Sequence, residues 1–172
     1  MNGTLGGYSA AFADDDGSAD PELRKALAGA GGGDQAAYLD ALVALCMARL
    51  LVPLVAGGDE TMTHDPEREG HMSTALLQRP DGQKAMLAFT GSDAMAQWFE
   101  RARPVPATLD VVCQTAQHEG AGTVLIDLEG PAPLVLEEAV VAEIAQGHRL
   151  VRLDDGYGWM LPGEGGASGS EA

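Results

Sequence analysis

The chain has 172 residues, 45% apolar and only 5% aromatic, which predicts one domain with a largely aliphatic core. Twenty-six Asp and Glu against 10 Lys and Arg give a formal net charge of −16. This acidity disfavours binding to nucleic-acid backbones and to anionic membranes. No secretory signal and no uninterrupted membrane-spanning stretch is visible, so we expect a cytoplasmic protein kept in solution by its charge.

The two ends of the chain have the composition of disordered segments. Residues 1–19 are rich in Gly, Ser, Ala and Asp without an apolar period, and residues 162–172 are mostly Gly, Ser, Ala and Glu. We therefore expect a disordered N-terminal arm over 1–19, one domain over 20–161 and a disordered tail over 162–172.

Two helices and a strand are predicted first. Asp20 and Pro21 mark the start of a helix that ends before a run of glycines, and a second helix follows over residues 34–47. The apolar run at 49–55 then predicts a strand. Pro53 cannot donate a hydrogen bond to a ladder, so we expect this strand to lie at a sheet edge or to carry a bulge.

The middle of the chain predicts a hairpin and a short helix. Strands near 71–78 and 83–89 flank an Asp-Gly turn. Thr90 and Asp93 have the spacing of a capping box and open a helix. That helix presents Met95, Trp98 and Phe99 on one side, which we interpret as core residues.

The remaining elements alternate between helices and strands. They are a helix capped by Thr108, strands over 123–128 and 134–136, a helix over 138–146 and a small hairpin over 150–161. The order predicts an α+β fold, a two-layer single domain with a mixed sheet of about five strands and helices packed on it.

Three stretches in register resemble the SseB N-terminal domain family, named for enhanced serine sensitivity. They are residues 48–54, residues 87–92 with Trp98, and residues 130–137 with the helix that follows. The resemblance covers about residues 36–148. It implies no catalytic residue, because the family has no established reaction. The type III secretion translocon protein of the same name has a long apolar segment and coiled-coil heptads, which this sequence lacks. One departure from the family pattern is His71, where a charged residue commonly precedes the methionine of the second strand.

The polar segment from His64 to His71 is the strongest candidate for a metal site. In an extended chain Asp65, Glu67, Glu69 and His71 point to one side, and imidazole with carboxylates binds divalent ions. The segment has no HExxH spacing and carries an arginine in its middle. Solvated loop charges are therefore the preferred interpretation.

The other candidate chemistries are weaker still. Cys46 and Cys113 lie in apolar helical patterns, which predicts buried, reduced thiols and no disulfide framework. Cys113 and His118 are five residues apart on one predicted helix and point to different faces. Ser168 lacks the last glycine of a nucleophile elbow, and the glycines at 29–33 lack the Lys-Ser/Thr of a phosphate-binding loop.

The sequence thus predicts no catalytic residue, no cofactor and no metal ligand. It favours a non-catalytic, cytoplasmic protein-binding or adaptor module, with the strand that contains Pro53 offering an edge to a partner strand. The acidity favours a protein partner with a basic face, and neither nucleic acid nor membrane is expected. The alternative is a metal-dependent enzyme that uses the His64–His71 loop.

Overall fold

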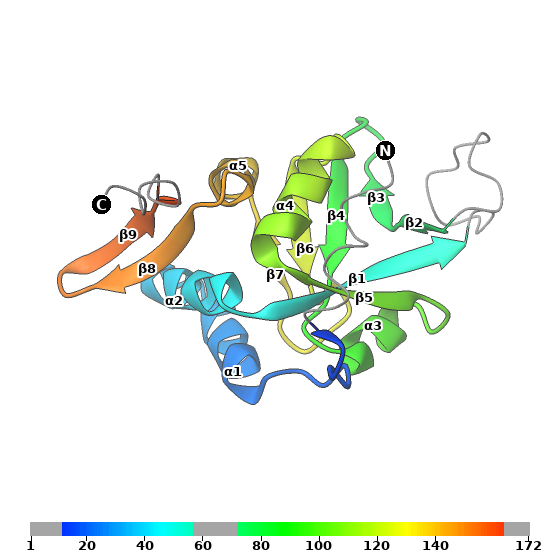
Figure 1. Cartoon of the computed structure of the whole chain (residues 1–172), viewed down its shortest axis with the longest axis horizontal. Helices are drawn as coiled ribbons and strands as arrows, with labels where there is room; N and C mark the ends of the chain where they lie inside the picture. Colours follow the sequence, from blue (N-terminus) through cyan, green and yellow to red (C-terminus); the bar gives the residue numbers. More distant parts are fainter. Residues whose placement is uncertain (1–11, 57–71, 164–172) are drawn as a thin grey trace, which may run out of the picture.

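The computed structural model describes residues 12–56 and 72–163, and it has an α+β fold (Figure 1). The helices are α1 (Pro21–Ala30), α2 (Gln35–Cys46), α3 (Ser92–Trp98), α4 (Leu109–His118) and α5 (Glu138–Ala145). The strands are β1 (Arg49–Ala56), β2 (Met72–Thr74), β3 (Leu76–Gln78), β4 (Lys84–Ala88), β5 (Arg103–Thr108), β6 (Thr123–Ile126), β7 (Leu134–Leu136), β8 (Arg149–Leu153) and β9 (Gly156–Met160). Among the described residues, no helix is long and apolar enough to cross a membrane.

Local signals set the boundaries of the first helices as predicted. The Asp20 carboxylate accepts a 2.9 Å hydrogen bond from the N–H of Glu22, and Pro21 occupies the first helical position, where no donor is needed. The Asp34 carboxylate accepts from the N–H groups of Ala36 and Ala37 at the start of α2. The glycines between the two helices form the predicted linker.

The strands form three sheets. β2, β1 and β5 make an antiparallel sheet in that order, and β3, β4, β6 and β7 make a mixed sheet in which β4 and β6 are parallel. The predicted single mixed sheet of about five strands is thus divided in two, and the parts join where Leu51 of β1 pairs with Phe89 just after β4. β8 and β9 form a separate hairpin.

Pro53 lies inside the sheet, so the predicted edge position of β1 is wrong. β1 is the middle strand, and along one side it changes neighbours from Phe89 to β2. Pro53 sits at this change, where its carbonyl accepts a 3.1 Å hydrogen bond from the N–H of Ala75. The backbone nitrogen of Pro53 carries no hydrogen and cannot donate. It lies between Phe89 and β2, where the ladder needs no donor, so the sheet tolerates a proline there.

The outer edge of β5 is also unsuited to pairing. The backbone N–H and C=O of Leu51 both bond to Phe89, at 2.8 and 2.9 Å. Leu51 therefore makes no hydrogen bond to Pro106, its partner on β5. The pairing of Pro53 with Pro104, two residues further along, is likewise non-hydrogen-bonded. The nitrogens of Pro104 and Pro106 therefore face outward and remove two donors that an added strand would use. Neither β1 nor β5 offers the edge that the sequence suggested.

Two apolar clusters pack on opposite faces of β1 and β4. The larger joins α1, α2, α4 and α5 to Leu50 and Val52, and it corresponds to the predicted two-layer core. The smaller lies on the other face, under α3, and contains Leu51 and Phe89. The alternation of β1 side chains between both clusters explains why its sequence is continuously apolar.

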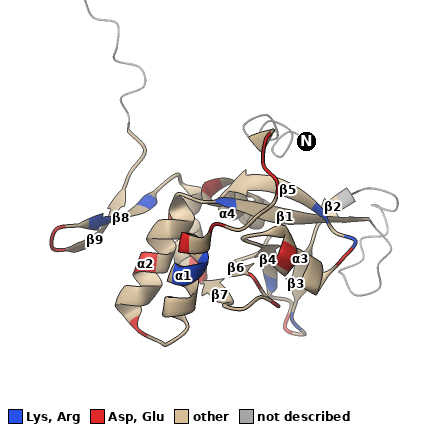
Figure 2. Cartoon of the chain, turned by 90° about the horizontal axis from the view of Figure 1, so that it is seen from below, with Lys and Arg blue, Asp and Glu red and all other residues tan. Residues whose placement is uncertain are grey.

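The β8–β9 hairpin is confirmed, whereas the strand predicted near 71–78 is divided, because β2 pairs with β1 and only β3 pairs with β4. In the turn between β3 and β4, the N–H of Gly82 donates to the carbonyl of Arg79 at 2.9 Å, and Gly82 has the positive φ of 88° that this turn requires. The β8–β9 hairpin projects from the body of the molecule beyond α2, as the two views in Figures 1 and 2 agree.

Candidate functional site

The densest polar contacts in the described residues converge on Thr90, which follows β4. Its backbone N–H and its hydroxyl donate to the two carboxylate oxygens of Asp127, at 2.8 and 2.6 Å. Its hydroxyl also accepts from Nε of Arg24 at 3.1 Å, and its carbonyl accepts from Arg49 at 3.0 Å. Thr90 and Asp127 are both 1% exposed, so one buried threonine links two strand ends to two arginines.

Asp127 is held in a conformation that few side chains adopt. It is the one described non-glycine residue with positive φ, at 53°, and its N–H donates to Ala88 at 3.0 Å. A Cβ on Gly130 would lie only 2.9 Å from Cβ of Asp127, so a glycine is required there. The tight turn after β6 thereby aims the carboxylate at Thr90.

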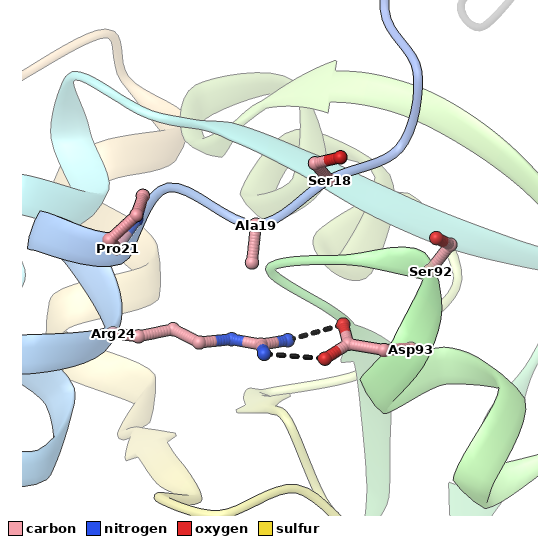
Figure 3. A pocket seen from close by; sticks show the side chains of 6 residues that line it. All are labelled: Ser18, Ala19, Pro21, Arg24, Ser92 and Asp93. Carbon is pink, nitrogen blue, oxygen red and sulfur yellow. Dashed lines mark hydrogen bonds and ion pairs between the residues drawn. The ribbon is translucent and has the colours of Figure 1, made fainter.

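Arg24 of α1 and Asp93 of α3 form a two-pronged ion pair at 2.5 and 2.6 Å, which Figure 3 shows from close by. The hydrogen bonds from Arg24 lower the pKa of Asp93 below its ordinary value, and the same bonds raise the pKa of Arg24. The Asp93 side chain remains 62% exposed, so solvent screens much of this attraction.

This arrangement corrects the predicted capping box. α3 begins after Gly91 without any side-chain cap, because Thr90 bonds to Asp127 and Asp93 bonds to Arg24. The helix itself is confirmed. Met95 is buried, and Trp98 and Phe99 pack on the smaller cluster as predicted, with the rings of Phe89 and Trp98 5.7 Å apart.

Arg49 at the start of β1 binds the segment that precedes α1. Its Nε and one terminal nitrogen contact the Asp15 carboxylate at 2.5 and 2.9 Å, and the same nitrogen donates to the carbonyl of Ser18 at 2.6 Å. The N–H of Ser92 donates to the carbonyl of Gly17 at 2.8 Å. We call residues 12–19 the N-terminal strap. The strap belongs to the arm that the composition predicts to be disordered, and its Asp15 lies against Arg49, 34 residues away. The rest of that arm lies outside the described residues.

An open pocket of about 570 Å³ lies between the strap, α1 and α3. It is lined by Ser18, Ala19, Pro21, Arg24, Ser92 and Asp93 (Figure 3). The hydroxyls of Ser18 and Ser92 and the Arg24–Asp93 ion pair supply the pocket with both hydrogen-bond donors and acceptors. It is thus suited to recognising a polar segment.

The metal hypothesis cannot be placed on this structure, because the His64–His71 loop, Asp65, Glu67 and Glu69 included, lies outside the described residues. Within the parts that are described, no group of three His, Cys, Asp or Glu side chains is positioned to hold a metal ion. Ser168 likewise lies outside them.

The cysteines are free, as expected from their number and spacing. Cys113 is fully buried in α4, and burial raises the pKa of its thiol to about 12. Cys46 is half-buried, and burial raises the pKa of its thiol as well. His118 is exposed at the end of α4, so the structure does not bring it to Cys113.

A second surface, on the β8–β9 hairpin, was not anticipated from the sequence. Tyr157 anchors the inner face to α2 through a 2.6 Å hydrogen bond to Asp40 and a 3.2 Å hydrogen bond to the carbonyl of Ala36. Leu153 and Met160 alternate to the outer face, where they are 49% and 51% exposed. The side chain of Leu153 lies over Gly158, since a Cβ there would be 2.9 Å from its Cδ1.

Charge is distributed unevenly on this hairpin. β9 contains no charged residue, whereas Asp154 and Asp155 are exposed in the turn (Figure 2). Leu161, which follows β9, is 61% exposed and extends the apolar surface. We call Leu153, Met160 and Leu161 the hairpin patch. The sequence did carry a signal for it, because a strand with uncharged residues at every position needs cover on both faces.

Comparison with known proteins gives one match. The family model described as the SseB protein N-terminal domain matches residues 23–143. No curated protein and no solved structure matches the chain. The matched range contains Arg24, Arg49, Thr90 and Asp127, whereas the strap and the β8–β9 hairpin lie outside it.

Proposed function

Because the chain belongs to the SseB N-terminal domain family, for which the resemblance implies no reaction, we propose that it is a non-catalytic protein-binding or adaptor module acting in the cytoplasm. The observation that supports this is the hairpin patch. Exposed large apolar side chains can mark a contact surface. Leu153 and Met160 lie on one outer face, near opposite ends of a hairpin that projects from the domain and is fixed to it through Tyr157 and Asp40.

The partner is expected to combine an apolar surface with a basic group. The apolar surface covers Leu153 and Met160, which are each about half exposed. The basic group meets Asp154 and Asp155 at the turn, and the net charge of −16 speeds encounter with a cationic face. A complex of this kind weakens as salt rises.

The proposal is tested by affinity capture with matched variants of the full chain. The double variant Leu153→Asp, Met160→Asp places acid in the patch at positions that are already exposed, so the fold is retained. Val135→Asp makes the same kind of change on β7, at a side chain 42% exposed. A protein that the wild type and Val135→Asp retain, and that the double variant loses, supports the proposal.

Two outcomes would contradict it. One is that the wild type and the double variant retain the same proteins, with or without high salt. The other is turnover of a small molecule that requires a divalent ion and disappears in His64→Ala, His71→Ala. The second result would support the enzyme that uses the His64–His71 loop.

A further inference from the structure

The N-terminal strap lies on polar groups that the family-matched part of the chain provides, and we call the surface between Arg49, Gly91 and Ser92 the cleft. One wall is the guanidinium group of Arg49, which the carbonyl of Thr90 orients at 3.0 Å. The floor is Gly91, and the other wall begins at Ser92, whose backbone N–H points to the strap. Arg49 and Ser92 lie within residues 23–143, whereas the strap does not. The family match therefore includes the cleft and does not include the segment that lies in it.

The strap binds through polar contacts. One terminal nitrogen of Arg49 donates to the Asp15 carboxylate and to the carbonyl of Ser18, and Nε of Arg49 makes an ion-pair contact with the other Asp15 oxygen. The N–H of Ser92 donates to the carbonyl of Gly17. No strap residue is a member of either apolar cluster. The Arg49 and Asp15 side chains are only 15% and 12% exposed, so their ion pair is largely shielded from water. The strap is therefore held by one buried ion pair and by hydrogen bonds to two of its carbonyls, without apolar packing in either cluster.

The cleft imposes a sequence requirement on what fills it. A carboxylate must face Arg49, because its Nε and terminal nitrogen contact both oxygens at 2.5 and 2.9 Å. Two residues later a glycine is needed, since Gly17 has a φ of 79° and a Cβ there would lie 3.1 Å from Oγ of Ser92. Small residues must follow, because Gly91 and Ala19 approach so closely that a Cβ on Gly91 would be 2.8 Å from Cβ of Ala19.

We propose that the cleft between Arg49 and Ser92 is a binding site for an acidic turn of the form Asp-x-Gly, which residues 15–17 fill in cis. In this turn the N–H of Gly17 donates to the Asp15 carboxylate at 2.9 Å. A partner protein carrying such a segment displaces the strap, and its following residues take the place of Ser18 and Ala19 beside Arg24 and Asp93. A tethered segment acts as a competitor at an effective concentration on the order of mM. The site is distinct from the hairpin patch and does not depend on it.

The test uses a variant of the full chain whose own strap no longer binds in the cleft. Asp15→Lys places a cation beside Arg49 and removes the carboxylate that anchors the strap. The probe is a fluorescent peptide of residues 12–20, and its binding is followed by fluorescence anisotropy at low salt. We expect the dissociation constant to be at least about tenfold lower for Asp15→Lys than for the wild type, because the cis competitor is gone.

Two controls define the chemistry of the site. A peptide with Asp15→Asn loses the charged acceptor, and one with Gly17→Val cannot adopt the positive φ, so each should bind at least about tenfold more weakly. Arg49→Met combined with Asp15→Lys should abolish binding. Circular dichroism and melting temperature establish that each protein variant is folded.

Several results would overturn the proposal. Absence of peptide binding to folded Asp15→Lys would show that the cleft accepts the strap only in cis. Equal binding to the wild type and to Asp15→Lys would place the peptide elsewhere. Loss of folding in both Asp15→Lys and the milder Asp15→Asn would make the strap an integral part of the domain.

Discussion

The hydroxyl of Thr90 donates a 2.6 Å hydrogen bond to a carboxylate oxygen of Asp127, and the backbone N–H of Thr90 donates to the other oxygen at 2.8 Å. Both residues are 1% exposed, so these bonds are shielded from water. They connect the end of β4 to the end of the parallel strand β6. Because Thr90 also contacts Arg24 and Arg49, this buried pair organises the cleft and the pocket.

Replacing Asp127 by Asn should destabilise the domain by about 1–3 kcal/mol, because a buried charged acceptor is lost and an amide donor faces the Thr90 hydroxyl. Asn tolerates the positive φ of 53° at this position, so backbone strain adds little. Urea unfolding followed by tryptophan fluorescence measures the change. Asp155→Asn, in the exposed turn, is the matched control and should shift the free energy of unfolding by less than about 0.5 kcal/mol. Equal shifts for both variants would mean that the buried pair contributes nothing specific.

The Arg24–Asp93 pair should contribute only about 0.5–1 kcal/mol, because the Asp93 side chain is 62% exposed. A double-mutant cycle with Arg24→Met and Asp93→Asn isolates the coupling free energy. The coupling should fall in 1 M salt, where charges are screened over about 3 Å. A coupling that is unchanged by salt would indicate packing of the arginine stem instead of charge.

The same pair predicts a pH dependence. The folded-state pKa of Asp93 is lowered from the ordinary value of 3.8, chiefly by hydrogen bonding to Arg24. Its stabilisation is therefore fully present above that ordinary value and is lost as the pH falls through the lower, folded pKa. The stability difference between the wild type and Asp93→Asn should be constant from neutral pH to about pH 5 and shrink in more acidic solution. A difference that grows on acidification would contradict this assignment.

Several local signals were read correctly from the sequence, although Thr108 begins α4 without a side-chain cap and the strand β5 before it was not predicted. Asp20 caps α1 and Gly82 shapes its turn because the groups they bond lie within three residues. Thr90 and Asp93 have the spacing of a capping box, but partners 37 and 69 residues away offer a buried carboxylate and a guanidinium group. A buried carboxylate for Thr90 and a guanidinium group for Asp93 thus outcompete the local cap that their spacing predicts.

Position within a sheet was the other failure. A proline indicates an edge if the strand keeps the same neighbour along the whole of each side. On one side β1 instead pairs first with Phe89 and then with β2, and Pro53 lies at the change, where no backbone donor is needed. In α2, the spacing of Leu39, Leu42, Val43 and Cys46 predicts the buried face, but the buried residues are Ala41, Leu42 and Leu45. A helix that is apolar on nearly every side does not define which face is buried.

Neither cysteine should react quickly with a thiol reagent in the native protein. The Cys113 thiol is fully buried with a pKa raised from 9.0 to about 12, and burial also raises the pKa of Cys46. At pH 8 both are protonated and unreactive. Half-buried Cys46 should be labelled before Cys113, and both should react rapidly in urea. Fast labelling of Cys113 in folded protein would overturn its placement.

The raised thiol pKa values also limit stability in alkali. In the unfolded chain a thiol ionises above about pH 9, whereas the Cys113 thiol in the native state keeps its proton to about pH 12. The stabilisation that comes from the raised pKa of Cys113 is therefore complete below about pH 9 and is lost as the pH rises from about 9 to about 12. Cys113→Ala should be less sensitive to pH in this window, as measured by urea unfolding at a series of pH values. Parallel pH profiles for the variant and the wild type would contradict the prediction.

Trp98 should be a stabilising residue of the smaller apolar cluster. Its ring lies 5.7 Å from the rings of fully buried Phe89 and of Phe99. Truncation to Ala removes both contacts, but the ring is only half-buried, so the loss should fall somewhat below the roughly 3–5 kcal/mol typical of buried aromatics. Gln97→Ala on the exposed side of α3 is the control and should change the free energy of unfolding by less than about 0.5 kcal/mol. If Trp98→Ala unfolds like the wild type but no longer retains the partner captured through the hairpin patch, the ring serves binding and not the core.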